Sequence, residues 1–126
     1  MLGLIIFVFG KSDDEFSSAQ GAPMVSVNVP ELTGEVLEGK AFFDAKCSVC
    51  HGENGAGKQG LAPPLVHKIY EPSHHGDFSF YRAVSAGVRM HHWSFGDMPP
   101  IPDVNEAQTE KIIAYIRTLQ RANGIN

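Results

Sequence analysis

Two cysteines and a histidine lie close together in the first half of the chain, in the order Cys47, Cys50 and His51. The spacing C-x-x-C-H is the attachment motif of c-type haem. On a helical turn each thiol can form a thioether with one haem vinyl group, and the adjacent imidazole then lies beneath the iron. The 126 residues contain only these 2 cysteines, so attachment would leave no thiol over. The motif therefore predicts one covalently bound haem c.

Three other uses of a cysteine pair fit this sequence less well. A structural zinc site needs four ligands, usually from two such pairs, and the chain has no second pair. A thioredoxin-like dithiol needs a βαβ pattern around C-x-x-C, and no strand-rich sequence surrounds this one. A disulfide between Cys47 and Cys50 would close a very small loop and would contribute little to stability.

Met98 is the candidate for the second protein ligand of the iron. It lies in a stretch without helical periodicity and is followed by Pro99. Proline holds the backbone extended, so the thioether can point towards the iron, and a soft thioether sulfur stabilises reduced iron. The alternative is an ordinary core methionine. Met24, which precedes the motif, and Met90, which no proline follows, are weaker candidates.

Five further histidines could compete for the iron or bind another metal. They are His67, His74, His75, His91 and His92. A distal histidine would give a bis-histidine haem of lower potential, and the two adjacent pairs could hold zinc or copper together with Glu71 or Asp77. The simpler interpretation is that all are loop histidines, exposed to solvent or bonded to the backbone. The sequence favours this simpler interpretation, because no ligand spacing is enforced here.

One helix is expected to lead into the C-x-x-C-H motif, and a second is expected after it. The first runs from an N-cap at Thr33 into the turn that holds Cys47, and the second starts near Asp77 and stops at Gly87. Between them lies a long stretch rich in glycine and proline, residues 52–76, which has no periodicity. A loop of this length without regular structure usually has a functional reason such as enclosing a ligand, and haem is a good candidate for that ligand.

The third expected helix is the best marked. Asn105 caps it, and Gln108 occupies the partner position of a capping box. Apolar residues recur on one face, which predicts packing against the rest of the domain. Arg117 and Arg121 lie near the end of the helix, and Gly124 stops it.

With these pieces the sequence resembles a class I, mitochondrial-type cytochrome c with one haem, over residues 34–123. Gly39 and Phe43 match the glycine and the aromatic residue of that family's first helix, and Tyr115 matches the aromatic residue of its last helix. The resemblance implies a small all-α cytochrome c fold, with three main helices and long loops around one covalent haem. It also implies that the first and last helices cross at these residues, and that Met98 is the methionine ligand of the iron.

The segment Ala62-Pro63-Pro64-Leu65 resembles the G-P-x-L segment of the same family. By that likeness the Pro63 carbonyl accepts a hydrogen bond from the ring nitrogen of His51 that faces away from the iron, which fixes the orientation and the basicity of the imidazole. Leu65 would pack on the haem. Ala62 departs from the family, because glycine is usual there. Residues 66–92 carry histidines that have no counterpart in the family.

The chain has 126 residues and a net charge of −4, which fits one domain and argues against nucleic acid or an anionic membrane face as the main partner. We expect an apolar segment at residues 1–10, a linker with an extended segment at 11–30, and a monohaem cytochrome c domain at 31–126. The extended segment is predicted from Val25, Val27 and Val29, which alternate with polar residues.

The apolar run that begins at Leu2 and ends at Phe9 bears on localisation. It is too short to span a bilayer, and it is interpreted as an anchor or as the remnant of a signal peptide. Because bacterial haem attachment through thioethers takes place outside the cytoplasm, we expect a periplasmic protein. If the segment is retained, the protein would lie at the outer face of the inner membrane.

The residues together predict a one-electron carrier that shuttles electrons between redox partners outside the cytoplasm, and not an enzyme. Cys47 and Cys50 would attach the haem, and His51 and Met98 would ligate its iron. An alternative is a tethered cytochrome c subunit of a membrane-bound or multisubunit redox complex. A third possibility is a haem sensor or a peroxidase-like catalyst, which would need an open sixth position that Met98 argues against.

Overall fold

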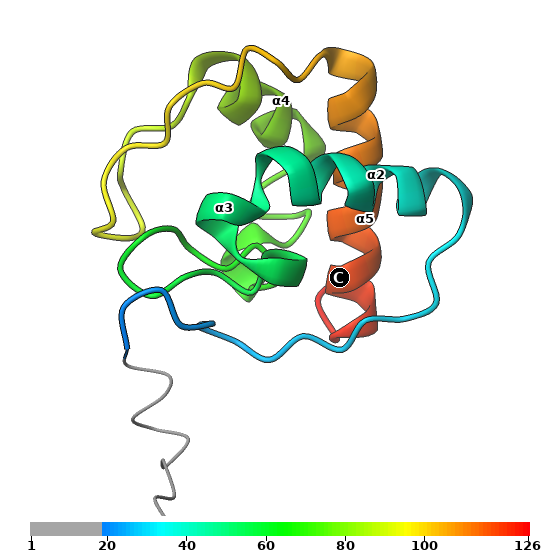
Figure 1. The fold of residues 1–126 in the computed structure, drawn as a ribbon, viewed down its shortest axis with the longest axis horizontal. Coiled ribbons are helices and arrows are strands. Elements are labelled where there is room, and N and C mark those ends of the chain that lie inside the picture. The colour runs from blue at the N-terminus through cyan, green and yellow to red at the C-terminus, as the bar shows by residue number, and fades with distance from the viewer. Residues whose placement is uncertain (1–18) are drawn as a thin grey trace, which may run out of the picture.

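The structure, a computed structural model, describes residues 19–126, and its regular elements are helices (Figure 1). The α-helices are α2 (Gly34–Lys46), α3 (Ser48–His51), α4 (Asp77–Ala86) and α5 (Glu106–Ala122), with two short 3-10 helices, η1 (Glu53–Gly55) and η2 (Lys68–Tyr70). The described residues form isolated β-bridges but no β-strand. The predicted all-α class is therefore confirmed, and α2, α4 and α5 are the three main helices that were expected.

The ends of the helices follow local signals in the sequence. Thr33 is the N-cap of α2, and Gly87 ends α4 with a φ of 76°. The first helix does not run unbroken through the motif, because it stops before Cys47 and a separate helical turn, α3, follows. Cys47 still donates its N–H to the Phe43 carbonyl at 2.8 Å, but the N–H of Cys50 bonds to the Cys47 carbonyl at 3.2 Å in the tighter three-residue spacing.

Helix α2 passes across α5, and the two helices touch at a glycine (Figure 1). A Cβ atom built on Gly39 would lie 1.9 Å from the carbonyl oxygen of Lys111 and 3.1 Å from Cβ of Tyr115. One turn further along α2, the ring of Phe43 packs on the ring of Tyr115 with 5.4 Å between the centroids. The backbones can approach this closely only because position 39 has no side chain.

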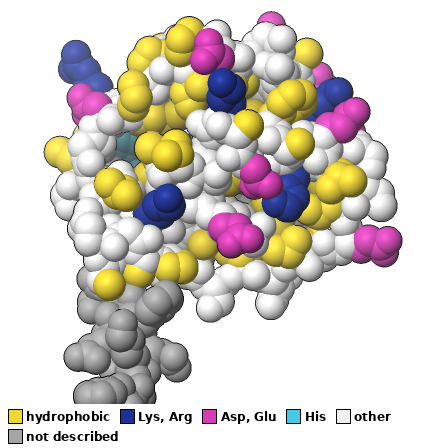
Figure 2. Space-filling model, viewed as in Figure 1, with side chains coloured by type: hydrophobic (Ala, Val, Ile, Leu, Met, Phe, Trp, Pro, Cys, Tyr) yellow, Lys and Arg dark blue, Asp and Glu magenta, His cyan; other side chains and the backbone are white. Residues whose placement is uncertain are grey.

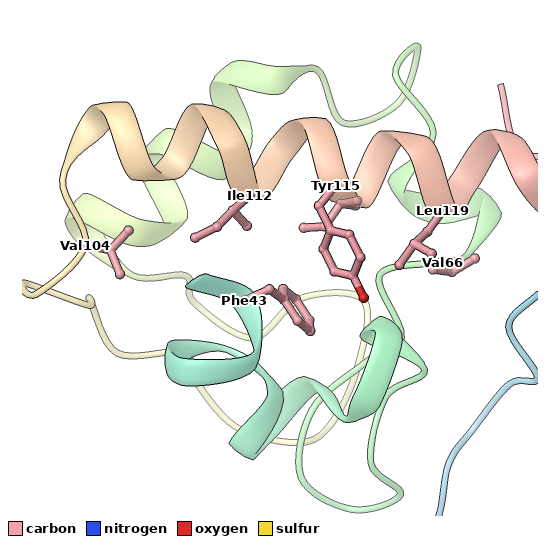
Figure 3. Close-up of a cluster of buried hydrophobic side chains, with 7 residues drawn as sticks. Phe43, Val66, Val104, Ile112, Tyr115 and Leu119 are labelled. Carbon is pink, nitrogen blue, oxygen red and sulfur yellow. The ribbon is translucent and has the colours of Figure 1, made fainter. Parts of the chain in front are cut away.

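Helix α5 supplies most of the hydrophobic core (Figure 3). The buried cluster consists of Phe43, Val66, Val104, Ile112, Tyr115, Ile116 and Leu119. The predicted capping box begins the helix: Gln108 donates its N–H to Oδ1 of Asn105 at 2.8 Å, and Asn105 donates its N–H to Oε1 of Gln108 at 3.0 Å. The helix that was best marked in the sequence is thus also the one around which the domain packs.

The alternating valines form extended chain without becoming a sheet strand. Val25 and Val27 are half-buried, and Val29 is exposed. The segment is held at its end by Asn28 and Asn123, which exchange two hydrogen bonds of 2.8 and 2.9 Å between side chain and backbone. The period of two in this sequence therefore reflects one side lying on the domain, since no neighbouring strand pairs with it in the described part of the chain.

The apolar run from Leu2 to Phe9 and the linker up to residue 18 lie outside the described residues. Among residues 19–126, none of the helices has both the length and the apolar character that crossing a membrane requires.

Charged side chains of both signs are interspersed on the face of the molecule that Figure 2 displays. The described residues form surface ion pairs, such as Lys111 with Glu38 at 2.9 Å and Lys46 with Asp103 at 3.5 Å. Exposed pairs of this kind add little stability, because water and salt screen them. Because each pair joins opposite charges, it also leaves little net electrostatic potential at its position on the surface.

Candidate haem-binding site

The motif residues lie where α2 gives way to α3. Cys47 is the half-buried junction residue, and Cys50 and His51 occupy the single turn of α3, with the His51 N–H bonded to the Cys47 carbonyl at 2.9 Å. Both cysteines are free thiols. Three residues apart on a helical turn, their side chains project from the same side of the chain. This is the arrangement that two thioether bonds to one planar ligand require.

The raised pKa of Cys47 argues against a thiol redox pair. Burial, and to a smaller extent the neighbouring charge of Cys50, raises the pKa of Cys47 to about 11. A reactive dithiol needs a cysteine whose pKa is lowered, because the thiolate is the nucleophile. Cys47 is instead protonated at neutral pH.

His51 is held in one orientation by the backbone of a distant loop. Its Nδ1 lies 2.9 Å from the carbonyl oxygen of Pro63. Because a carbonyl only accepts, Nδ1 carries the proton, and Nε2 keeps a free lone pair. Burial lowers the pKa of the imidazole, an effect that the hydrogen bond to Pro63 opposes. The result is a neutral, oriented imidazole, which is the form that binds iron.

The loop that presents Pro63 is fixed by backbone hydrogen bonds. Lys58 and Ala62 exchange two of them, at 3.0 and 3.2 Å, and Gly57 donates its N–H to the His51 carbonyl at 2.6 Å. Ala62 is buried and is not among the described residues with a positive φ. An alanine therefore stands in place of the family's usual glycine without backbone strain, and its methyl group fills space inside the loop.

Met98 is tied through its backbone to the segment that follows α4. Met98 and Val88 exchange two hydrogen bonds, both of 2.9 Å. Gly87 makes this contact possible, because a Cβ atom there would lie 2.4 Å from the Met98 carbonyl oxygen. The side chain of Met98 is half-buried, whereas Met90 is exposed and its sulfur accepts a hydrogen bond from the Gly96 N–H at 3.3 Å. Met90 is thus engaged locally, and Met98 remains the better candidate ligand.

Comparison with known protein families matches the cytochrome c family over residues 36–120, which is more than half of the chain. The chain belongs to the cytochrome c family. The matched span includes Cys47, Cys50, His51 and Met98. The domain accordingly carries covalently bound haem c with its iron, and its function is haem-based electron transfer. No curated protein matches the chain.

The donor atoms of this cytochrome fit the cofactor. Haem c takes three kinds of group from a protein, and all three are present here. They are two thiols that form no disulfide, a neutral imidazole with a free Nε2, and a methionine sulfur. Leu65, which was expected to pack on the haem, is half-buried against the core cluster, and its carbonyl accepts a hydrogen bond from Nε2 of Gln120 at 3.0 Å. Its role towards the haem stays a prediction.

The structure separates His67 of this cytochrome from a cluster formed by three of the other histidines. His67 caps η2, where its Nδ1 accepts the Ile69 N–H at 3.1 Å. His74, His75 and His92 instead come together, with one ring nitrogen from each lying within 4.8 Å of the others. The simpler interpretation of loop histidines fits all five: His74, His91 and His92 are exposed, and His67 and His75 are bonded to the backbone. What the sequence did not predict is that residues 74–75 and 91–92 meet in space.

Arg117 was not predicted from the sequence to be buried or to hold the loop that carries the histidines. It was placed as a charge near the end of α5, yet it is only 7% exposed and bonds to the carbonyls of Tyr70 and His75. A sequence signal existed, because position 117 lies one helical turn from the buried Ile113 and three residues before the buried Gln120.

Proposed function

We propose that the cytochrome is a one-electron carrier whose iron is ligated by His51 and Met98, and that it is not an enzyme. The observation that carries the proposal is the 2.9 Å contact between His51 Nδ1 and the Pro63 carbonyl, which leaves Nε2 as a ready iron ligand. Bound haem c supplies an iron that alternates between the ferric and ferrous states.

The residues of the chain have separate tasks in this proposal. Cys47 and Cys50 provide the sulfur atoms of the two thioether bonds, and His51 provides a neutral nitrogen ligand. Pro63 keeps that ring in position and raises its basicity as a ligand through the hydrogen bond. Met98 provides a soft sulfur, which favours the ferrous state and so raises the reduction potential.

A carrier needs no general acid, base or nucleophile. With His51 and Met98 both bound to it, the iron would offer no coordination position to a substrate, and the protein would have only to tune the potential and to admit redox partners. A sensor or peroxidase-like catalyst would require Met98 to be absent from the iron or easily displaced.

The proposal is tested by the absorption spectrum of the oxidised holoprotein. We expect a weak far-red sulfur-to-iron charge-transfer band that disappears in Met98→Ala and persists in Met90→Ala, the matched control. A wild-type spectrum without the band would exclude Met98 as a ligand. Rapid binding of carbon monoxide by the reduced wild-type protein would favour the enzymatic or sensor alternative.

Redox partners outside the cytoplasm, neutral or basic in charge, are part of the same proposal. Its support is the net charge of −4 and the extracytoplasmic site of haem attachment. The apolar run from Leu2 to Phe9 supports the alternative of a tethered subunit at the outer face of the inner membrane. Cell fractionation separates the two: a haem-stained band in the periplasmic fraction supports the shuttle, and one confined to the membrane fraction supports the tether.

A further inference from the structure

A cluster of imidazoles lies between two segments of the chain that are remote in sequence. His74 and His75 belong to the turn before α4, and His92 belongs to the loop after it. One ring nitrogen from each of the three lies within 4.8 Å of the others. Nitrogens bound to one Zn²⁺ lie about 3.4 Å apart, because each bond of about 2.1 Å belongs to a tetrahedral arrangement. A small rotation of the side chains covers the difference.

We propose that His74, His75 and His92 form a binding site for a divalent transition-metal ion such as Zn²⁺, distinct from the haem site. The three nitrogens supply three positions of a tetrahedron, and solvent completes it, since His74 and His92 are exposed. The ligand set of imidazoles selects zinc, copper or nickel ions over magnesium and calcium, which prefer oxygen.

A backbone hydrogen bond holds His75 in a tautomer that leaves one ring nitrogen free for a metal. Its Nδ1 lies 2.6 Å from the Ile69 carbonyl oxygen, so Nδ1 donates a proton there and Nε2 keeps its lone pair. A hydrogen bond from the far ring nitrogen to a backbone carbonyl is the usual support of a metal-binding histidine. The same bond limits the rotation of the half-buried ring.

The turn that carries His74 and His75 is built without help from a metal. The carbonyl of Glu71 accepts both of their N–H groups, at 3.0 and 2.8 Å. The carbonyl of His75 accepts a hydrogen bond from Arg117 on α5 at 2.5 Å. These contacts attach the turn to the core of the domain.

The loop that carries His92 is attached to the same region. The next residue, Trp93, donates its Nε1–H to the hydroxyl oxygen of Tyr70 at 3.0 Å. The ring of Tyr70 in turn packs against that of His75, with 4.9 Å between centroids. Both halves of the proposed site are thereby held together before an ion binds, which reduces the entropy that binding must overcome.

The environment of His92 favours its neutral form, which is the form that binds a metal. Desolvation, followed by the neighbouring charges of His91, His75 and His74, lowers the pKa of His92. The centroids of the His91 and His92 rings are 4.3 Å apart. The carboxylate of Asp77, which the sequence offered as a fourth ligand, is bonded to Arg117 at 2.9 Å instead. Glu71 is likewise not part of the cluster formed by His74, His75 and His92. The protein ligands of the site are therefore nitrogen atoms alone.

The test is calorimetric titration of the chelator-treated holoprotein with ZnCl₂. We expect one Zn²⁺ per chain, and we expect His92→Gln and His74→Gln each to weaken binding about tenfold or more. His67→Asn is the matched control, because asparagine can keep an acceptor for the Ile69 N–H while removing an imidazole that lies outside the cluster. It should bind Zn²⁺ as the wild type does.

Two further readouts keep the outcome decisive. In nuclear magnetic resonance spectra the ring nitrogens of His74, His75 and His92 should shift on addition of Zn²⁺, with the haem absorption unchanged. Undiminished binding in His92→Gln would overturn the proposal, and so would equal affinity for Mg²⁺. A change in the haem spectrum on addition of Zn²⁺ would place the ion at an iron ligand and would also overturn it.

Discussion

At the scale of single residues, Arg117 shows how one side chain organises an irregular loop. Its guanidinium donates to the carboxylate of Asp77, to the side chain of Gln120 and to the carbonyls of Tyr70 and His75, at distances of 2.5–2.9 Å. Asp77 is largely exposed, so water screens that ion pair. The two loop carbonyls are the more valuable partners, because Arg117 is buried beside them.

Replacing this arginine should destabilise the protein strongly. We expect Arg117→Met to lower the free energy of unfolding by about 3 kcal/mol, because the His75 carbonyl and the Asp77 carboxylate lose this donor and the Tyr70 carbonyl keeps only Gln120. Denaturant unfolding of the holoprotein measures the change. Arg121→Met is the control: Arg121 is exposed and bonds to Thr118 at 3.2 Å, and its loss should change stability by less than about 0.5 kcal/mol. Equal effects of the two substitutions would contradict the assigned role.

At the scale of elements, the crossing of α2 and α5 is the contact on which the domain depends. The motif follows directly after α2, so the position of α2 on α5 also sets the position of Cys47. Gly39 allows the helices to touch, and Phe43 with Tyr115 fills the space beside the contact. A helix–helix contact thus positions the C-x-x-C-H motif.

Adding one methyl group at this crossing should push the helices apart. Alanine is a better helix former than glycine by about 1 kcal/mol, but its Cβ would lie 1.9 Å from the Lys111 carbonyl oxygen. Overpacking against backbone outweighs the gain, so we expect Gly39→Ala to lower the unfolding free energy by about 3 kcal/mol, and Gly39→Val by more. Thermal unfolding of the holoprotein measures this. An unchanged midpoint would disprove the close contact.

Gly76→Ala provides the comparison for that substitution. At position 76 an added Cβ would be 3.9 Å from the nearest atom, the Pro72 carbonyl oxygen, and φ is −62°. The substitution meets neither a clash nor backbone strain, so its effect on the unfolding midpoint should be small.

At the scale of the whole molecule, long irregular segments surround a small helical core. Residues 88–105, between α4 and α5, contain no helix and are fixed by a few contacts such as the Val88–Met98 pair. If His51 and Met98 ligate the iron as proposed, the cofactor adds a link between α3 and this segment. Holding the haem would then also stabilise the domain.

Removal of the attachment thiols should show this link. In Cys47→Ala combined with Cys50→Ala we expect haem to be lost on a denaturing gel, where the wild type keeps its haem stain, because the thioether bonds are missing. The thermal midpoint should also fall, since a ligand that dissociates stabilises less than one that is attached. Haem that stays on the variant in the gel would exclude these cysteines as the attachment sites.

Much of this domain is readable from the sequence because the deciding interactions are local. The capping box of Asn105 and Gln108 forms between residues three positions apart, and Gly87 ends its helix through its own φ. The C-x-x-C-H motif needs only neighbouring residues on one turn. The resemblance added the contact between His51 and Pro63, which the structure places at 2.9 Å.

Other features depend on which distant segments meet, and a single sequence does not state that. Arg117 is recognised as buried only when its helix packs on the loop carrying Tyr70 and His75. The approach of His92 to His74 requires the segments on either side of α4 to converge. Such contacts result from the packing of the whole core, where the free energy is shared among many residues. They were therefore decided only by the tertiary structure.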